Sequence, residues 1–401
     1  MRVCLVTSSF LPQVGGAEIV VHQLASALLE LGHEVVVLAP RSSARLRPLL
    51  PYRLETFLPG TLYLLNRNER MGEVYLAGTL MRLRGRFDVF NLHFALPLGP
   101  ALARRRSFLG APLLLTFHGT DIQTAAGIGY GLRLDPRLDL RIREAANGAD
   151  GLVAISSSVR EAIAQTLIRP KPVFDIPNGV DVRRLSRERP RGRFRAKFGI
   201  PQDAPLLLAV GRNHPKKGFD ILIEAMRLVV NEEPEVHCAI VGRSTTALRP
   251  QVDRLGLDGH VHLVEELRLP GDAQAPPAFP PEELLEAYWD CDVYVSPSRI
   301  EGSSLAVLEA LAASCAAVVA DAPGNRDTVR DGENGLVCAP EHPEDLARKI
   351  LVLLRNPAFR AQLGKTARES AWDFDWREVA RRYVEAYEAV GNTRRPSEAR
   401  R

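Results

Sequence analysis

Short apolar runs alternate with amphipathic segments along residues 1–180. The apolar runs have the length of buried strands, and segments such as residues 17–31 carry their apolar side chains on one side of a helix. This alternation is typical of a parallel sheet with helices on both faces. The expected strands are residues 2–7, 34–38, 88–92, 112–117, 151–155 and 173–176. The expected helices are residues 17–31, 97–106, 138–147 and 157–167.

Two stretches interrupt the alternation. Residues 41–85 are rich in Arg, Leu and Pro and less regular, so we interpret them as an insertion that contains helices. The turn sequence Pro177-Asn178-Gly179-Val180-Asp181 is followed by an Arg-rich stretch, which predicts a domain boundary between residues 182 and 183.

The alternation then starts again. The expected strands are residues 206–210, 236–241, 261–264, 293–296 and 316–320. The expected helices are residues 218–230, 246–255, 282–289, 343–354, 357–370 and 376–390. Residues 267–281 form a loop rich in Pro, Gly and Ala that is long enough to be a functional or mobile segment.

The pattern therefore predicts an α/β protein with two Rossmann-like domains that face each other across a cleft. Residues 1–182 form the first domain and residues 183–372 the second. Residues 373–391 form a separate helix, and we expect the basic tail 392–401 to be disordered. Ligands of such sheets bind at the carboxyl ends of the strands, which places the expected site in the cleft.

The charge balance excludes some partners. The chain has 52 basic and 48 acidic residues, and a net charge of +4 is too balanced to indicate a nucleic-acid binder. The basic excess is local, at residues 104–106, 183–197 and 394–401. Such patches suit an acidic substrate or an anionic membrane surface, although a solvated surface is the more common explanation.

The cysteines and the apolar runs indicate a cytoplasmic protein. The five cysteines are widely spaced and lie mostly in apolar runs, so we interpret them as reduced core residues. The longest uncharged run, residues 89–103, falls short of a membrane span.

One stretch combines a helix start with two carboxylates. Glu301 precedes the expected helix, Ser303 or Ser304 can serve as its N-cap, and Glu309 lies inside the apolar run that follows. Free N–H groups at a helix start bind phosphate, and Ser304 and Glu309 are about 7.5 Å apart along a helix. A phosphate at the helix tip and a sugar diol at Glu309 would fit a nucleotide. The alternative is an ordinary helix in which an Arg or a Lys pairs with Glu309, because an unpaired buried carboxylate is costly.

Two glycine-containing loops, each after an expected strand, are candidate phosphate sites. Gly15-Gly16 allows close approach of the backbone to a phosphate, although a tight turn is an equally good explanation. Arg212 and Lys217 bring two cations to the loop at residues 211–218 and can bind a diphosphate. A solvated basic loop is the alternative there.

Two histidines follow neighbouring expected strands. His118 opens the sequence His-Gly-Thr-Asp and can donate a hydrogen bond to a sugar hydroxyl or to a phosphate. His93 has a similar position and is our candidate for binding an acceptor. A lone histidine is more often structural, and that interpretation stays open for both.

Two patterns typical of metal sites are weak here. Asp290-Cys291-Asp292 spans a helix end and a strand start, so we expect capping and turn roles for its carboxylates. His260 and His262 have no third ligand nearby in the sequence, and an ordinary strand is the better interpretation. We therefore expect no metal site.

Together these loops resemble those of the group 1 glycosyltransferases (family four), retaining enzymes of the GT-B fold that use nucleotide-diphosphate sugars. The family's two glutamates with seven residues between them match Glu301 and Glu309. The other matches are Gly15-Gly16, residues 118–121, residues 178–181, Gly211-Arg212, Lys217-Gly218 and residues 331–337. The resemblance covers nearly the whole chain.

The resemblance implies a role for each catalytic candidate. Arg212 and Lys217 hold the donor diphosphate and stabilise it as the leaving group. Glu301 contacts hydroxyls of the transferred sugar, Glu309 binds the ribose hydroxyls, and His118 lies beside the donor sugar and positions it.

The resemblance also implies how the rest of the site is built. The donor phosphates contact the backbone around five positions: Gly15, Gly16, Ser303, Ser304 and Leu305. No metal and no cofactor is expected, because cationic side chains and helix dipoles replace them. The helix from Trp376 crosses back onto the first domain and acts with the interdomain turn as a hinge.

The chain departs from the family beside the expected donor phosphates. Ser303 and Ser304 stand where a bulky residue and a second glycine are frequent. Two later segments also differ: residues 312–317, where a Gly and a Pro are usual, and residues 323–327, where the family has Gly-Gly and a Glu.

The sequence therefore predicts a cytoplasmic retaining glycosyltransferase. It moves a sugar from a UDP- or GDP-linked donor to an acceptor hydroxyl in the synthesis of a glycan, glycolipid or polysaccharide. The acceptor is expected on the first domain, with residues 41–85 as the specificity element. A lipid-linked acceptor and peripheral membrane contact are a further hypothesis. It is motivated by seven arginines: Arg41, Arg45, Arg47, Arg53, Arg104, Arg105 and Arg106.

Two alternatives remain. A nucleotide-sugar epimerase shares the fold, but it usually lacks the Gly-Arg and Lys-Gly loop together with the paired glutamates. A non-catalytic sugar-nucleotide binding protein is disfavoured because all the candidate charged groups are present.

Overall fold

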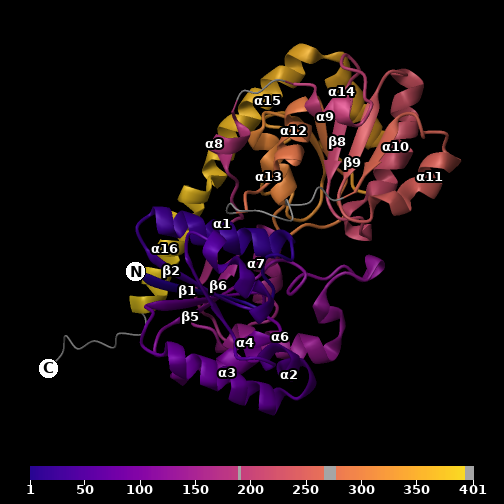
Figure 1. Ribbon diagram of the computed structural model, residues 1–401. Helices are drawn as coiled ribbons and strands as arrows, with labels where there is room; N and C mark the ends of the chain where they lie inside the picture. Colours follow the sequence, from indigo (N-terminus) through magenta and orange to yellow (C-terminus); the bar gives the residue numbers. More distant parts are fainter. Residues whose placement is uncertain (188–190, 266–276, 393–401) are drawn as a thin grey trace. The chain divides into compact units, whose positions relative to one another are not determined.

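The computed structural model describes residues 1–187, 191–265 and 277–392, which form two compact units (Figure 1). Unit 1 holds residues 1–179, Pro277 and residues 376–392, and unit 2 holds the other described residues between 180 and 375. The sequence placed the boundaries at 182/183 and 372/373. Most of the expected loop at residues 267–281 and nearly all of the expected tail at 392–401 lie outside the described residues.

Unit 1 is built on a seven-stranded sheet in the order β3-β2-β1-β4-β5-β6-β7, with every pair parallel. The strands are β1 (Arg2–Thr7), β2 (Glu34–Ala39), β3 (Arg53–Thr56), β4 (Val89–His93), β5 (Leu113–Thr116), β6 (Gly151–Ala154) and β7 (Val173–Asp175). The strand order places β1 and β4 at its centre, and helices on both faces therefore bury nearly all of their residues.

Helices cover both faces of this sheet. The α-helices are α1 (Gly16–Glu30), α2 (Thr61–Arg67), α3 (Glu69–Leu83), α4 (Leu98–Arg104), α5 (Arg106–Leu109), α6 (Pro136–Gly148), α7 (Ser157–Ala164) and α16 (Trp376–Asn392). The 3₁₀ helices are η1 (Arg41–Leu49), η2 (Ala126–Ile128) and η3 (Leu132–Leu134). Figure 1 shows α1 and α16 on one side of the sheet and α3, α4 and α6 on the other.

Unit 2 repeats the plan with a six-stranded parallel sheet in the order β10-β9-β8-β11-β12-β13. The strands are β8 (Leu206–Val210), β9 (His237–Val241), β10 (Val261–Val264), β11 (Val293–Ser296), β12 (Ala316–Ala320) and β13 (Leu336–Cys338). The α-helices are α8 (Val182–Leu185), α9 (Arg193–Lys197), α10 (Phe219–Glu232), α11 (Arg249–Arg254), α12 (Glu282–Asp290), α13 (Leu305–Ala312), α14 (Pro343–Arg355) and α15 (Pro357–Ala371). The 3₁₀ helices are η4 (Pro215–Lys217), η5 (Thr245–Leu248) and η6 (Trp372–Phe374).

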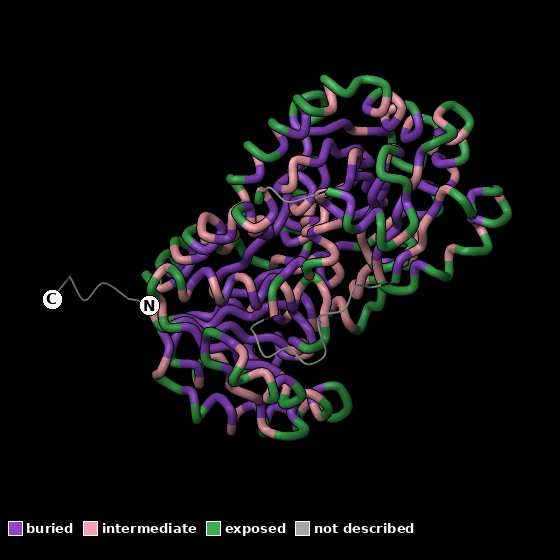
Figure 2. Tube along the Cα trace, turned by 45° about the horizontal axis from the view of Figure 1, so that its top comes forward, coloured by how far each residue is buried: buried purple, intermediate pink, exposed green. Residues whose placement is uncertain are grey.

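The strands of unit 2 separate two apolar cores. Alternate side chains of a strand point to opposite faces of the sheet. Leu207 and Ala209 therefore pack with α10 and α14, while Leu206 and Leu208 pack with α12 and α13. Figure 2 shows buried segments inside each unit and exposed segments at its surface. The prediction of two parallel α/β sheets is confirmed.

Two edge strands and one helix are among the differences from the expectations. Residues 53–56, inside the expected insertion, form the edge strand β3, and residues 336–338 form the unexpected edge strand β13. Both are short, and periodicity over three or four residues is a weak signal. The expected helix at residues 246–255 is a 3₁₀ turn followed by α11. Pro250 lies in the first turn of α11, where proline starts a helix rather than continuing one.

The last helix is held on unit 1 by buried polar contacts as well as by apolar packing. The Tyr387 hydroxyl in α16 donates to Oδ1 of Asn91 in β4, at 2.9 Å. The Asn91 amide donates to Oγ1 of Thr116 in β5, at 3.0 Å. Gly179, the last residue before the chain passes to unit 2, packs so tightly on Trp376 that a Cβ would lie 2.4 Å from its ring.

We expect Tyr387→Phe to lower the free energy of unfolding by about 1–3 kcal/mol, because it leaves a buried amide oxygen unpaired. Urea denaturation measures this change. The matched control is Tyr63→Phe, whose ring is 62% exposed and whose effect should stay within about 0.5 kcal/mol. Equal stability of the two variants would contradict the role given to the Tyr387 hydroxyl.

Candidate functional site

The sheet of unit 2 has a topological switch point between β8 and β11. These strands are neighbours, yet the chain runs from β8 to β9 on one side and from β11 to β12 on the other. Parallel sheets bind ligands at the carboxyl ends of such a strand pair. The loops at this point are residues 211–218 and residues 297–304, which contain most of the predicted donor site.

Close backbone contacts hold the two loops together. Gly218 has φ +64°, and a Cβ on it would lie 2.1 Å from the carbonyl oxygen of Pro297. The N–H of Arg299 donates to the carbonyl oxygen of Lys216 at 2.7 Å. The Arg299 guanidinium bridges back to Asp220 with two hydrogen bonds of 2.7 and 2.9 Å. The loops therefore approach as closely as two backbones can, and only glycine fits at 218.

A buried ion cluster lies on this framework. Oε1 of Glu301 is 2.6 Å from Nζ of Lys217, and Oε2 is 2.9 Å from Nζ of Lys216. The Ser298 hydroxyl donates to Oε1 at 2.9 Å. The Glu301 side chain is only 4% exposed, and burial alone would raise its pKa. The two ammonium groups outweigh burial and lower the pKa of Glu301 to about 2.

The cluster retains excess positive charge. Burial lowers the pKa of Lys217, and the Glu301 carboxylate opposes that shift. Arg212 is exposed, and it makes no hydrogen bond or ion pair with any residue that the structure describes. Lys216, Lys217 and Arg212 together carry three positive charges against the single negative charge of Glu301, so the loops suit an anionic ligand.

Helix α13 starts beside this cluster. Ser304 is its N-cap, as predicted, and the Ser304 hydroxyl accepts from the N–H of Val307 at 3.4 Å. In the described part of the chain, the N–H groups of Leu305 and Ala306 have no hydrogen-bond acceptor. Free N–H groups at a helix N-terminus favour an anion.

Glu309 has a partner that the sequence analysis did not anticipate. Its Oε2 accepts from the hydroxyl of Tyr288 in α12 at 2.8 Å. Burial raises the pKa of Glu309 to about 7, although the Tyr288 hydrogen bond opposes the shift. Among the described residues, neither an Arg nor a Lys forms the ion pair with it that the alternative interpretation expected. A carboxylate with one neutral donor retains oxygen lone pairs that could accept from a diol.

Unit 1 has its own switch point between β1 and β4. Gly15 and Gly16 open α1 after β1, and the N–H groups of Gly16 and Ala17 have no acceptor among the described residues. The Glu18 carboxylate lies at the same helix end, 2.5 Å from where a Cβ on Gly15 would be. This carboxylate counteracts the attraction of the helix end for phosphate.

The two predicted histidines are in contact. Nδ1 of His93 at the end of β4 lies 3.1 Å from Nε2 of His118 after β5. His93 is fully buried, so it has no surface for the direct contact with an acceptor that its position predicts. His118 is partly exposed, and its backbone N–H donates to the buried carboxylate of Asp121 at 2.9 Å. Burial raises the pKa of Asp121 to about 6, against several backbone hydrogen bonds.

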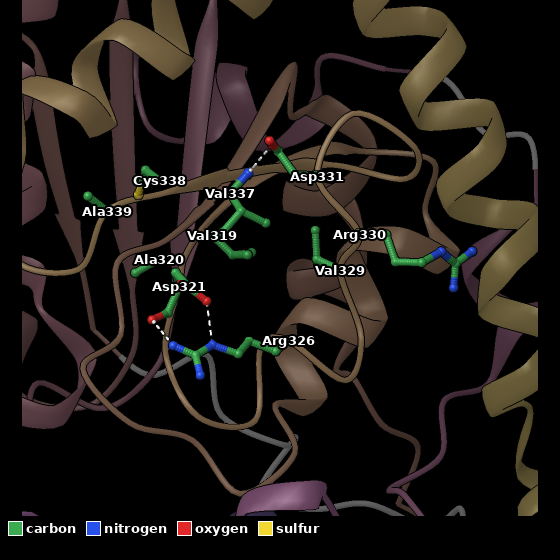
Figure 3. Close-up of a pocket in the computed structure, with 10 residues that line it drawn as sticks. All are labelled: Val319, Ala320, Asp321, Arg326, Val329, Arg330, Asp331, Val337, Cys338 and Ala339. Atoms are coloured by element: carbon green, nitrogen blue, oxygen red, sulfur yellow. Dashed lines mark hydrogen bonds and ion pairs between the residues drawn. The ribbon is translucent and has the colours of Figure 1, made fainter.

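A separate pocket of about 460 Å³ lies at the carboxyl ends of β12 and β13 (Figure 3). Its charged side chains are engaged with one another or with the backbone. Arg326 pairs with Asp321, and Asp331 accepts from the N–H of Val337 at 2.8 Å. Figure 3 shows Arg330 pointing away from the pocket. Because the charged groups named here already have partners among the described residues, we do not assign this pocket.

The residues of the two weak metal patterns make structural contacts within unit 2. Asp290 accepts from the N–H of Arg195 at 3.1 Å, and Asp292 accepts from the Arg195 guanidinium at 2.8 Å. His262 hydrogen-bonds His237 at 3.0 Å. Across the described ranges, no three His, Cys, Asp or Glu side chains are grouped so that they could hold a metal ion.

Comparison with known proteins decides the family. The profile described as "Glycosyl transferases group 1" matches residues 190–370, and "Glycosyltransferase Family 4" matches residues 14–184. A D-inositol 3-phosphate glycosyltransferase of Frankia alni is 31% identical over 310 residues, which cover 76% of this chain and 74% of that protein. The chain belongs to the group 1 glycosyltransferases. A protein of the same description from Thermobispora bispora is 28% identical over 93% of this chain and 89% of that protein.

Solved structures share the fold of this glycosyltransferase. Anabaena HepE, in complex with UDP and glucose, has a TM-score of 0.77 at 19% identity, over 97% of this chain and 100% of that chain. Sucrose-phosphate synthase from Thermosynechococcus elongatus has a TM-score of 0.77 at 20% identity, over 98% and 100%. The GT-B fold predicted from the sequence is confirmed.

The sequence analysis gave no role to several residues of the candidate site. Four of them contact a predicted residue: Lys216, Ser298, Tyr288 and Asp121. Lys216 and Ser298 lie within three residues of Lys217 and Glu301, so adjacency could have suggested them. Asp121 stands in the quoted His-Gly-Thr-Asp motif. Tyr288 had no signal, because it is an aromatic residue on an apolar helix face.

No helix in the described parts of this glycosyltransferase is both long enough and apolar enough to cross a bilayer. The arginines at residues 104–106 are engaged within unit 1. Arg104 pairs with Glu73 and Glu144, Arg105 pairs with Glu73, and Arg106 pairs with Asp150. These three side chains therefore do not form an unpaired basic patch.

The ion cluster predicts a stability difference that depends on pH. The folded pKa of Glu301, about 2, lies below the ordinary value of 4.5 for a glutamate. Its ionisation therefore stabilises the fold fully above pH 4.5, and that contribution is lost as the pH falls toward 2. The shift corresponds to about 3 kcal/mol. We expect the stability gap between wild type and Glu301→Gln to be constant from pH 8 to 6 and to narrow below pH 4.5.

Thermal unfolding across this pH series measures the gap. Asp253→Asn is the control, because Asp253 is exposed. The stability difference between wild type and this variant should stay near zero across the pH series. A gap for Glu301→Gln that closes already near pH 6 would contradict the ion cluster.

Proposed function

We propose that this protein transfers a glycosyl group from a nucleotide-diphosphate sugar to an acceptor hydroxyl, with retention of configuration at the anomeric carbon. The observation that carries the proposal is the buried cluster of Lys216, Lys217 and Glu301 beside Arg212, at the switch point of unit 2. It combines fixed cations for a diphosphate with a carboxylate for sugar hydroxyls. Retention is proposed because the paired glutamates match those of the retaining family.

The cations act on the leaving group. When the bond from the anomeric carbon to the diphosphate breaks, negative charge grows on the diphosphate oxygen. Lys217 and Arg212 stabilise that charge, and Lys217 needs little reorganisation because Glu301 already holds its ammonium group in place. The free N–H groups of Leu305 and Ala306 supply two further donors for the phosphates. Cationic side chains therefore serve where other transferases use a metal.

The two glutamates bind hydroxyls of the donor. Glu301 stays ionised because its pKa is lowered to about 2, so it accepts hydrogen bonds from hydroxyls of the transferred sugar. Glu309 accepts from the ribose hydroxyls while Tyr288 holds its other side. In unit 1, His118 donates to an oxygen of the bound substrate.

The relatives suggest which substrates to test. HepE has solved structures in complex with UDP and with UDP-glucose, and we propose a UDP-linked donor. The curated relatives are described as D-inositol 3-phosphate glycosyltransferases, and we propose a polyol or sugar acceptor with D-inositol 3-phosphate as the first candidate. A lipid-linked acceptor and membrane contact stay predictions, which the ion-paired arginines 104–106 do not strengthen.

Transfer assays with purified protein test the proposal. UDP-glucose, UDP-N-acetylglucosamine and GDP-mannose are each combined with D-inositol 3-phosphate and a panel of other hydroxyl acceptors. Nucleotide release is followed, and proton NMR of the product reports its anomeric configuration. We expect a product with the configuration of the donor. Inversion would refute retention, and donor isomerisation without transfer would indicate an epimerase.

Lys217→Met should lower kcat roughly ten- to hundredfold, because it removes a charged hydrogen bond to the leaving group. The matched control is Lys349→Met. Lys349 also contacts a carboxylate of unit 2, Asp331, but it does so beside β13, and its variant should keep wild-type kcat. Equal losses of kcat in the two variants would contradict the proposal, because only Lys217 of these two lysines belongs to the ion cluster with Glu301.

Donor affinity should depend on the protonation of Glu309. Its pKa of about 7 means that the accepting carboxylate is lost as the pH falls. We expect the Kd of a UDP-sugar to rise about tenfold from pH 8 to pH 6, since its diphosphate diester does not titrate there. Glu309→Gln should bind more weakly with no such dependence. Calorimetric titration measures both, and a pH-dependent Kd in the variant would assign the effect to another group.

A further inference from the structure

Buried His93 and partly exposed His118 form a pair near the switch point of unit 1. His93 ends β4 and has no exposed surface. Its ring centroid lies 5.3 Å from that of His118 and 6.4 Å from that of Tyr383 in α16. Its Nδ1 is 3.1 Å from Nε2 of His118. Packing on these sides fixes the ring, so the hydrogen bond between the histidines has one geometry.

The second nitrogen of His93 decides the direction of that bond. Nε2 of His93 is sealed from solvent and has no partner among the described residues. If Nε2 carried the proton, a buried N–H donor would lack an acceptor, which folded proteins seldom tolerate. The proton of neutral His93 therefore belongs on Nδ1, which donates to Nε2 of His118. Burial lowers the pKa of both rings, that of His118 to about 4, so both are neutral at pH 7.

The direction of the bond determines what His118 presents. When Nε2 of His118 accepts, its only proton is on Nδ1. The His118 residue is partly exposed, and its Nδ1 has no hydrogen bond to a described residue. The backbone of His118 is also held, because Asp121 accepts from the N–H groups of His118 and Ala95, both at 2.9 Å. The Nδ1–H group of His118 is therefore a hydrogen-bond donor at a fixed position near the carboxyl ends of β4 and β5.

We propose that His93 is a positioning residue that holds His118 as the Nδ1–H tautomer, so that His118 offers substrate a hydrogen-bond donor and not a base. The matching group is an oxygen with a free lone pair, such as a hydroxyl of the transferred sugar. The identity of that substrate rests on the proposed function, whereas the tautomer rests on the histidine pair alone. His93 thereby acts on the reaction without touching the acceptor.

NMR of the full chain tests the tautomer without any substrate. Long-range proton–nitrogen correlation spectra of protein labelled with ¹⁵N-histidine show which nitrogen of each ring carries the proton. The chain has nine histidines, and the spectrum of His118→Ala identifies the His118 signals. We expect a neutral His118 with its proton on Nδ1 at pH 7. A proton on Nε2, or a charged ring, would overturn the proposal.

Variants of His93 test the cause. His93→Leu removes the donor, so His118 should become a mixture of tautomers and kcat should fall roughly five- to tenfold, with less change in KM. His93→Asn keeps an N–H near the position of Nδ1 and should restore both the tautomer and most of kcat. His22→Asn is the control, because His22 is also buried but hydrogen-bonds Tyr52; its His118 signals should match wild type.

The outcomes separate the two proposals. A His93→Leu variant that keeps the Nδ1–H tautomer of His118 would refute the positioning role. If this variant does not fold, the wild-type spectrum and His93→Asn decide the question. The expected tautomer together with no transfer to any acceptor would refute the proposed function and leave the histidine pair intact.

Discussion

The geometry of the site in unit 2 depends on one buried carboxylate shared by two ammonium groups. Taking Glu301 out of water is unfavourable, and Lys216 and Lys217 more than offset that cost, as its lowered pKa shows. Loops 211–218 and 297–304 must approach closely for the pairing to exist, which explains why a glycine stands opposite Pro297. The same pairing holds the two lysines beside Glu301, which precedes the start of α13 and its free N–H groups. Folding of the loops and readiness for an anionic ligand therefore have one cause.

The two units share the same sheet plan, but the paired side chains at the switch point are charged in unit 2 and neutral in unit 1. At the switch point of unit 2 the side chains are charged, and burial is tolerated because the charges are paired. At the switch point of unit 1 the two histidines are neutral, because burial lowers their pKa and no carboxylate pairs with their rings among the described residues. Cations suit a diphosphate, whereas a neutral donor suits a sugar hydroxyl.

The sequence selected candidate residues but not the contacts between them. Motif spacing was enough to select Glu301, Lys217 and His118, because such loops follow strands at regular positions. It did not show that Lys217 and Glu301 touch, since 84 residues separate them. It also suggested that His93 binds an acceptor, whereas the structure buries its ring against His118. Residues with ordinary apolar surroundings, such as Tyr288, had no sequence signal at all.

The sequence by itself determined the alternation of strands and helices, the parallel sheets and the position of the loops that follow the strands. These properties depend on hydrophobic period, turn residues and length, which are local. Only the tertiary structure decided the edge strands β3 and β13, the contact between His93 and His118, and the contact of Tyr387 with Asn91, 296 residues away. Each of these depends on which groups meet after the sheets have formed, and on whether a buried atom then finds a partner. No pattern of neighbouring residues contains that information.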